Sequence, residues 1–351
     1  ARAQTDAELT FYYIRINEDS ARHYIRQMRS FIASDYHPEI EGYIKKYEGN
    51  LLAREGKYRE SIGPRTEAYD LFKKVRNYDE MGWTARGAAI SYFHLGDYAS
   101  SMDYFMIALA AFEQDEDRMG MGDIHNNLGA VSYVTGHPDK ALEYYERAME
   151  LYDEVGVEKR KGRILNNTGL IYFDQEEYER ALSHFLDAMK IYRSHGEDEQ
   201  LGGAYNNIAL CYFHREQYAL ARSYIHRALR EARTYNNKYQ EVSAYINLGS
   251  FSTEESYYDS ARDYLSQASE LAEAYEFRAL KANILEEKAL LAAAEKDFET
   301  AFKHYQQYHD TIHSIHSEEA DEKIANLMAS YEQQLKENEI RQLKEEQQNQ
   351  K

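Results

Sequence analysis

Small and bulky apolar residues recur along this chain every forty residues. One small or apolar column reads Leu9, Gly49, Ala89, Gly129, Gly169, Ala209, Gly249 and Ala289. A second small residue lies twelve positions later, and a bulkier residue lies four positions beyond that, as in Ala141 and Tyr145. A fixed period of this length, kept over eight copies in one frame, predicts an array of helical repeats.

Each copy predicts two antiparallel helices joined by a short turn, such as Gly96-Asp97. The sequence holds only 3 prolines and 18 glycines in 351 residues, which favours helices. We expect the small positions where helix axes approach closely, with the bulky positions filling the space beside them. The second copy departs from the pattern at Ser61, Pro64 and Arg65, so we expect its second helix to be short or bent.

The repeat resembles the tetratricopeptide repeat in its longer, forty-residue form. The residues that carry the resemblance are Asn127, Leu128, Gly129, Tyr133, Gly136, Ala141, Tyr145 and Ala148, with their periodic copies. The resemblance implies an all-α fold, a right-handed superhelix or α-solenoid of about eight helix-turn-helix repeats over residues 1–310. It also implies that the first helices of the repeats line a concave groove that binds an extended peptide or a partner's helix.

Residues 311–351 lack the repeat and predict one long, highly charged helix. Its early part is expected to cap the array, and its later part to protrude, because residues 336–351 carry little apolar surface. Ile324, Met328, Tyr331 and Leu335 follow a heptad-like spacing, through which two chains could dimerise. Similar charged helices follow the tetratricopeptide sensor regions of bacterial membrane-bound signalling proteins.

The charge of the chain argues against two classes of partner. The formal net charge is −19, whereas nucleic-acid surfaces need clustered Lys and Arg, and anionic lipid also attracts basic segments. No apolar run approaches the roughly 18 to 20 residues that span a bilayer, so we expect no membrane insertion. The start at Ala1 without a methionine favours a processed N-terminus and the periplasm over the cytoplasm.

We find no pattern that predicts catalysis or a cofactor. The sequence has no Gly-rich phosphate loop, nucleophile elbow or metalloprotease motif, so we expect a non-enzymatic protein. The single cysteine, Cys211, is expected to be a buried inert thiol. His309, His313 and His316 would share a helix face as zinc ligands can. We favour the alternative that this is only a polar helix face.

Three columns on the predicted inner face are candidates for binding a ligand. The first contains Lys46, Arg86, Asn126, Asn166 and Asn206, the second Asn127, Asn167, Asn207 and Asn247, and the third the aromatics Phe93, Tyr133, Phe173 and Phe213. Amides can pair with a peptide backbone, and the basic pair could hold a carboxylate. Each column has a structural alternative, in which the amides bond neighbouring helices, the aromatics pack and the cations pair with acids.

We therefore expect a peptide- or protein-binding module, the ligand-sensing input region of a bacterial signal-transduction protein. Two alternatives stay open. The Asn-rich repeats also resemble intracellular peptide-pheromone receptors of the Rap type, although those carry an effector region ahead of the repeats, for which this frame leaves no room. A constitutive scaffold or assembly factor is the other alternative.

Overall fold

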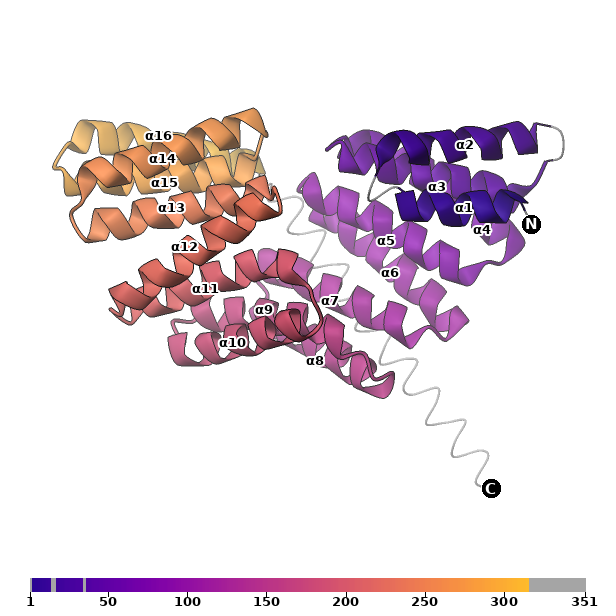
Figure 1. Ribbon diagram of the computed structural model, residues 1–351, viewed down its shortest axis with the longest axis horizontal. Coiled ribbons are helices and arrows are strands. Elements are labelled where there is room, and N and C mark those ends of the chain that lie inside the picture. Colours follow the sequence, from indigo (N-terminus) through magenta and orange to yellow (C-terminus); the bar gives the residue numbers. More distant parts are fainter. Residues whose placement is uncertain (1, 14–16, 34–35, 316–351) are drawn as a thin grey trace, which may run out of the picture. The chain divides into compact units, whose positions relative to one another are not determined.

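The computed structural model describes residues 2–13, 17–33 and 36–315, which form helices and no strand (Figure 1). They divide into two compact units, up to Val155 and from Gly156 onward. The first unit contains α1 (Arg2–Tyr13), α2 (Glu18–Ile32), α3 (Pro38–Arg54), α4 (Tyr58–Val75), α5 (Tyr78–His94), α6 (Tyr98–Asp115), α7 (Arg118–Val134) and α8 (Pro138–Glu154). The second contains α9 (Glu158–Asp174), α10 (Tyr178–Ser194), a 3₁₀ turn (Asp198–Gln200), α11 (Leu201–His214), α12 (Tyr218–Thr234), α13 (Lys238–Glu254), α14 (Tyr258–Ala274), α15 (Arg278–Ala294) and α16 (Phe298–Ile315).

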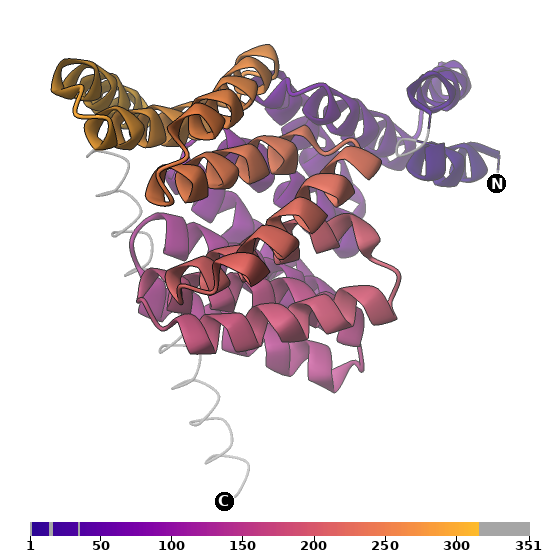
Figure 2. The ribbon, with the colours of Figure 1, turned by 60° about the vertical axis from the view of Figure 1, so that its left-hand side comes forward.

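Within each unit the helices pack as consecutive antiparallel hairpins (Figures 1 and 2). The second helix of one repeat then packs on the first helix of the next, as α4 does on α5 and α12 on α13. First helices of successive repeats also touch, for example α11 with α13 and α13 with α15. This arrangement confirms the predicted all-α repeat fold.

The turns share one backbone conformation. Gly96 and Gly136 have φ values of 76° and 79°, and at the same place in later repeats Glu176 has a φ of 62°. Glycine reaches this left-handed region without a steric penalty, whereas glutamate pays about 1–2 kcal/mol. After the turn, the Asp97 carboxylate accepts a hydrogen bond from the Ser100 backbone N–H at 3.0 Å and caps α6. The predicted turn positions are therefore confirmed, and they do not require glycine.

A glycine facing a large side chain forms the core contact of each hairpin that has one. A Cβ placed on Gly129 would lie 2.4 Å from Cε1 of Tyr145, and one on Gly169 would lie 2.6 Å from Cε1 of Phe185. Tyr145 and Phe185 are almost completely buried. The small and bulky columns of the sequence are thus the two sides of one close helix–helix contact.

The second helix of the second repeat, which we expected to be short or bent, is not shortened. Helix α4 runs from Tyr58 to Val75 with Pro64 inside it, as long as its counterpart α6. Pro64 removes one backbone hydrogen bond, but the helix buries Ser61, Arg65 and Ala68 against its neighbours. Packing therefore outweighs the cost of the proline.

The structure tests the membrane prediction for the described helices, and it does not test the prediction for the C-terminal helix. Among the helices that the structure describes, none is long and apolar enough to cross a membrane. The predicted charged helix, with its seam at Ile324, Met328, Tyr331 and Leu335, lies outside the described residues. Capping, protrusion and dimerisation through it remain predictions.

We predict that Gly169→Ala destabilises the protein by about 1–3 kcal/mol, because the added methyl group overlaps the Phe185 ring. Denaturant unfolding measures the change, and a second substitution, Phe185→Leu, should restore part of it by making room. Gly203→Ala is the control in the same unit, since its Cβ would meet only the Gln240 side chain at 3.4 Å. Equal effects of Gly169→Ala and Gly203→Ala would contradict the packing account.

Candidate functional site

Four asparagines join the first helices of the second unit. The Asn207 amide nitrogen donates to the Asn166 carbonyl oxygen at 3.0 Å, and the Asn247 amide donates to Asn206 at 2.8 Å. We call Asn166, Asn206, Asn207 and Asn247 the amide ladder; all four side chains are half-buried. These bonds join neighbouring helices, which is the structural alternative that we gave for the asparagine columns. Each pair still leaves one amide NH₂ and one carbonyl oxygen with hydrogen-bonding capacity for a ligand.

The corresponding face of the first unit carries Lys46 and Arg86 in place of two of the asparagines. In the second unit, each donor asparagine lies 41 positions after its acceptor. Asn127 should therefore donate to the residue at position 86, but Arg86 offers only donors. The Asn127 amide nitrogen accordingly has no hydrogen-bond partner in the described part of the chain. Asn126 is half-buried beside it on α7, and Asn167 is half-buried at the equivalent of Asn127 on α9.

Lys46 and Arg86 are both engaged within the protein. Lys46 forms an ion pair with Glu80, with 12% and 13% of the two side chains exposed, and its ammonium lies 5.6 Å from the centre of the Tyr47 ring. The Arg86 guanidinium lies 5.5 Å from the Trp83 ring. A ligand carboxylate at Lys46 would therefore have to compete with Glu80.

Three residues of the aromatic column contact a tyrosine at the start of the second helix of their own repeat. Phe173 lies 5.3 Å from Tyr178, and Phe213 lies 5.4 Å from Tyr218 and stacks on Phe251 at 4.1 Å. Phe93 contacts Tyr98 in the same way at 5.5 Å. Tyr133 is half-buried on α7. Packing between the two helices of a repeat thus occupies Phe93, Phe173 and Phe213.

Arg65, which the sequence reasoning did not select, is a buried cation without an ion-pair partner among the described residues. Only 6% of it is exposed, and it bonds Asn50 at 3.0 Å together with the Gly87 carbonyl oxygen and the Ser91 hydroxyl. Burial, assisted by Arg86, lowers its pKa to about 10. In the sequence, Arg65 stands where other repeats have a bulky apolar residue, such as Phe105 or Tyr145, and this departure could have indicated its role.

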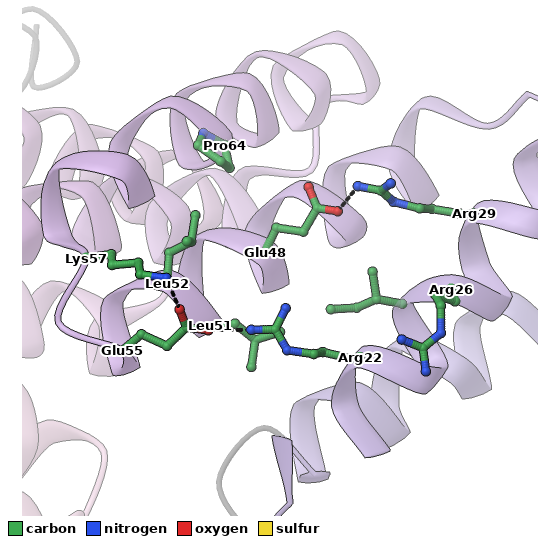
Figure 3. A pocket seen from close by; sticks show the side chains of 10 residues that line it. Arg22, Arg26, Arg29, Glu48, Leu51, Leu52, Glu55, Lys57 and Pro64 are labelled. Carbon is green, nitrogen blue, oxygen red and sulfur yellow. Dashed lines mark hydrogen bonds and ion pairs between the residues drawn. The ribbon is translucent and has the colours of Figure 1, made fainter. Parts of the chain in front are cut away.

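A cavity of about 440 Å³ lies between α2, α3 and α4 in the first unit (Figure 3). Arg22, Arg26 and Arg29 approach it from α2, Glu48 from α3, and Glu55 from the residue that directly follows α3. Figure 3 shows Arg29 paired with Glu48 and Arg22 with Glu55 across it. The Glu55 pKa is lowered by a hydrogen bond from Lys57 and by Arg22. These pairs tie α2 to the C-terminal end of α3, and they compensate the charges of Arg22 and Arg29.

A second cavity, of about 310 Å³, lies in the second unit. Ser250, Thr253, Glu254, Glu287 and Leu290 are among the residues that line it. Glu287 occupies the position after Asn247 in the second asparagine column, one repeat further along. Burial raises its pKa to about 7, with Glu286 acting in the same direction and a hydrogen bond from Ser250 opposing them. The inner face of this unit thus ends in an acidic group.

Two buried groups with perturbed pKa values lie in the packing of the repeats. His125 is 8% exposed, its Nδ1 has no hydrogen-bond partner in the described chain, and burial and Arg147 lower its pKa to about 4. Cys211 is fully buried, and burial raises the pKa of its thiol to about 12. The predicted burial of Cys211 is confirmed, whereas no sequence pattern pointed to His125.

The three histidines considered as zinc ligands are described only in part. His309 is exposed on α16, while the side chain of His313 and the whole of His316 lie outside the described residues. Among the side chains that the structure describes, no group of three His, Cys, Asp or Glu residues could hold a metal ion.

Comparison with known proteins identifies the repeat type of one part of the chain. A tetratricopeptide repeat family model matches residues 120–194. No curated protein matches the sequence. The apo form of the quorum sensor NprR from B. thuringiensis aligns with a TM-score of 0.67 and 17% identity, over 88% of this chain and 87% of that one.

Two further solved structures are similar. The apo form of RapI aligns with a TM-score of 0.64 and 17% identity, over 78% of this chain and 98% of its own. Aspartyl phosphate phosphatase F from Bacillus subtilis aligns with a TM-score of 0.66 and 13% identity, over 89% and 94%. At these identities the likeness shows the fold alone.

The direction of the amide bonds gives an asymmetric prediction. Asn166→Asp keeps an acceptor for Asn207 and should change stability by less than about 0.5 kcal/mol. Asn207→Asp places acceptor against acceptor and should cost about 1–3 kcal/mol. Denaturant unfolding at pH 7.5 compares the two. An equal cost for both substitutions would mean that the amide bond does not have this direction.

His125 should make the protein less stable in acid. Its pKa is about 4 in the folded chain against the ordinary 6.5, so the unfolded chain takes up a proton first as the pH falls. Its contribution, about 3 kcal/mol at most, is therefore complete above about pH 6.5 and is lost as the pH falls towards 4. His125→Tyr introduces the residue found at the equivalent positions Tyr205 and Tyr245. In this variant, the free energy of unfolding measured in urea should change less between these pH values than in the wild type. An unchanged pH dependence would contradict this assignment.

Proposed function

Because the chain is built of tetratricopeptide repeats, we propose that it is a non-enzymatic module that binds an extended peptide or partner segment. The proposed site is the first-helix face of the second unit, formed by α9, α11, α13 and α15. We further propose that binding there is the input of a bacterial signal-transduction protein. The observation that carries the proposal is the amide ladder.

The chemistry of the amide ladder suits a peptide backbone. Each Asn–Asn bond fixes two carboxamides and leaves a donor and an acceptor for a ligand. An extended peptide presents the same two groups at every residue whatever its side chains, so the ladder can bind backbone without demanding a sequence. Because the pairs are already held by hydrogen bonds, little side-chain freedom is lost on binding.

Two of the structurally similar proteins support a peptide as the ligand. NprR has been solved in complex with its cognate peptide NprX, and a Rap protein has been solved in complex with competence and sporulation factor. Their sequences are 16% and 15% identical to this chain. They support the class of ligand, while the residues proposed to bind it come from the geometry of this chain.

One observation favours a second candidate function, a peptide receptor of the Rap-like kind. The RapI fold is matched over 98% of its own length by 78% of this chain. In both candidates the second unit binds the peptide, and they differ in what the bound chain then contacts.

We predict that the full chain retains members of a randomised heptapeptide pool in affinity selection read by mass spectrometry. For a selected peptide, Asn206→Ala and Asn247→Ala should each weaken binding about tenfold in calorimetry, the loss expected for one hydrogen bond of about 1.4 kcal/mol. The control is Asn283→Ala, an exposed asparagine on α15 in the same unit. Retention of no peptide, or equal losses for all three variants, would contradict the proposed site.

A further inference from the structure

The cavity of the second unit arises where three columns of the repeat change together. Phe213 is replaced one repeat later by Thr253, Leu210 by Ser250, and Asn247 by Glu287. In the preceding repeat, Phe213 fills the equivalent space by stacking on Phe251 at 4.1 Å. Removing that ring and the leucine leaves about 310 Å³ between α13 and α15.

The walls of this cavity are rich in acceptors for a cation. Glu254 and Glu287 are carboxylates, and Ser250, Thr253, Ser256 and Tyr258 carry hydroxyl groups. No lysine, arginine or histidine is among the residues that line it, all of which the structure describes. A primary ammonium group has three donors and needs such a set of oxygens.

Among the described residues, no cation lines the cavity beside the carboxyl group of Glu287. This carboxyl group accepts a hydrogen bond from Ser250, and burial together with Glu286 disfavours its charged form. An ammonium group beside it would favour that charged form, as an opposite charge within about 4–6 Å does. Leu290, three residues further along α15, is 54% exposed and offers an apolar surface to a neighbouring side chain.

We propose that this cavity binds a primary ammonium group, the amino terminus of the bound peptide. The inference rests on the proposed function, because the peptide must first lie along the amide ladder. Glu287 continues the column of Asn207 and Asn247 by one repeat. A backbone that pairs with Asn247 therefore brings its next residues to Glu287, and an end there fixes the direction in which the peptide binds.

The test compares two heptapeptide pools on the full chain. Both are randomised without lysine and amidated at the C-terminus, and they differ only in acetylation of the amino terminus. The wild-type chain should bind peptides of the free-amine pool at least tenfold more tightly than their acetylated forms. Glu287→Gln should bind both forms alike, at the weaker level, while Glu273→Gln, an exposed carboxylate paired with Lys281, should behave as wild type.

The outcomes distinguish a failure of the ammonium site from a failure of the peptide-binding function. Equal binding of free and acetylated peptides by the wild type would overturn the ammonium site and leave the peptide-binding function standing. Retention of neither pool would overturn both. If an acetylated pool containing lysine regained affinity through Glu287, the ammonium would belong to a side chain, which overturns the amino-terminal assignment. A melting temperature of Glu287→Gln no lower than that of the wild type shows that the variant is folded.

Discussion

The close contact between a small residue on one helix and a large side chain on the next determines how the hairpins that contain it are built. At Gly129 and Tyr145, or Gly169 and Phe185, there is no room for even one added methyl group. This contact fixes the distance and rotation of the two helices in a hairpin. Residues two or three positions before the glycine, such as Asn166 and Asn167, are then held on one face.

Because the rotation of the helices is fixed, residues that recur every forty positions lie side by side on one surface. In the second unit, asparagines on successive first helices come close enough to bond, at 3.0 and 2.8 Å. In the first unit the same position is Arg86, and the bond to Asn127 is absent because arginine has no acceptor. One substitution in a repeat thus changes the local chemistry without changing the fold.

The sequence was sufficient for the repeat frame, the hairpins and the turns, because these depend on short-range spacing that eight copies repeat. It was not sufficient for the helix α4, where packing outweighs Pro64, or for the site. Which amide donates to which depends on the stagger between neighbouring helices. The roles of Arg65 and Glu287 depend on burial, which single columns do not reveal. The replacement of Phe213 by Thr253 was visible in the sequence, but its consequence, a cavity, is not.

The first-helix face of the second unit is proposed to bind a peptide through its amide ladder. Side-chain amide resonances in a ¹⁵N-correlation spectrum, assigned by single Asn substitutions, report on it directly. Addition of an affinity-selected peptide should shift the signals of Asn166, Asn206, Asn207 and Asn247 and leave that of Asn283 in place. Unchanged ladder signals under saturating peptide would contradict the account.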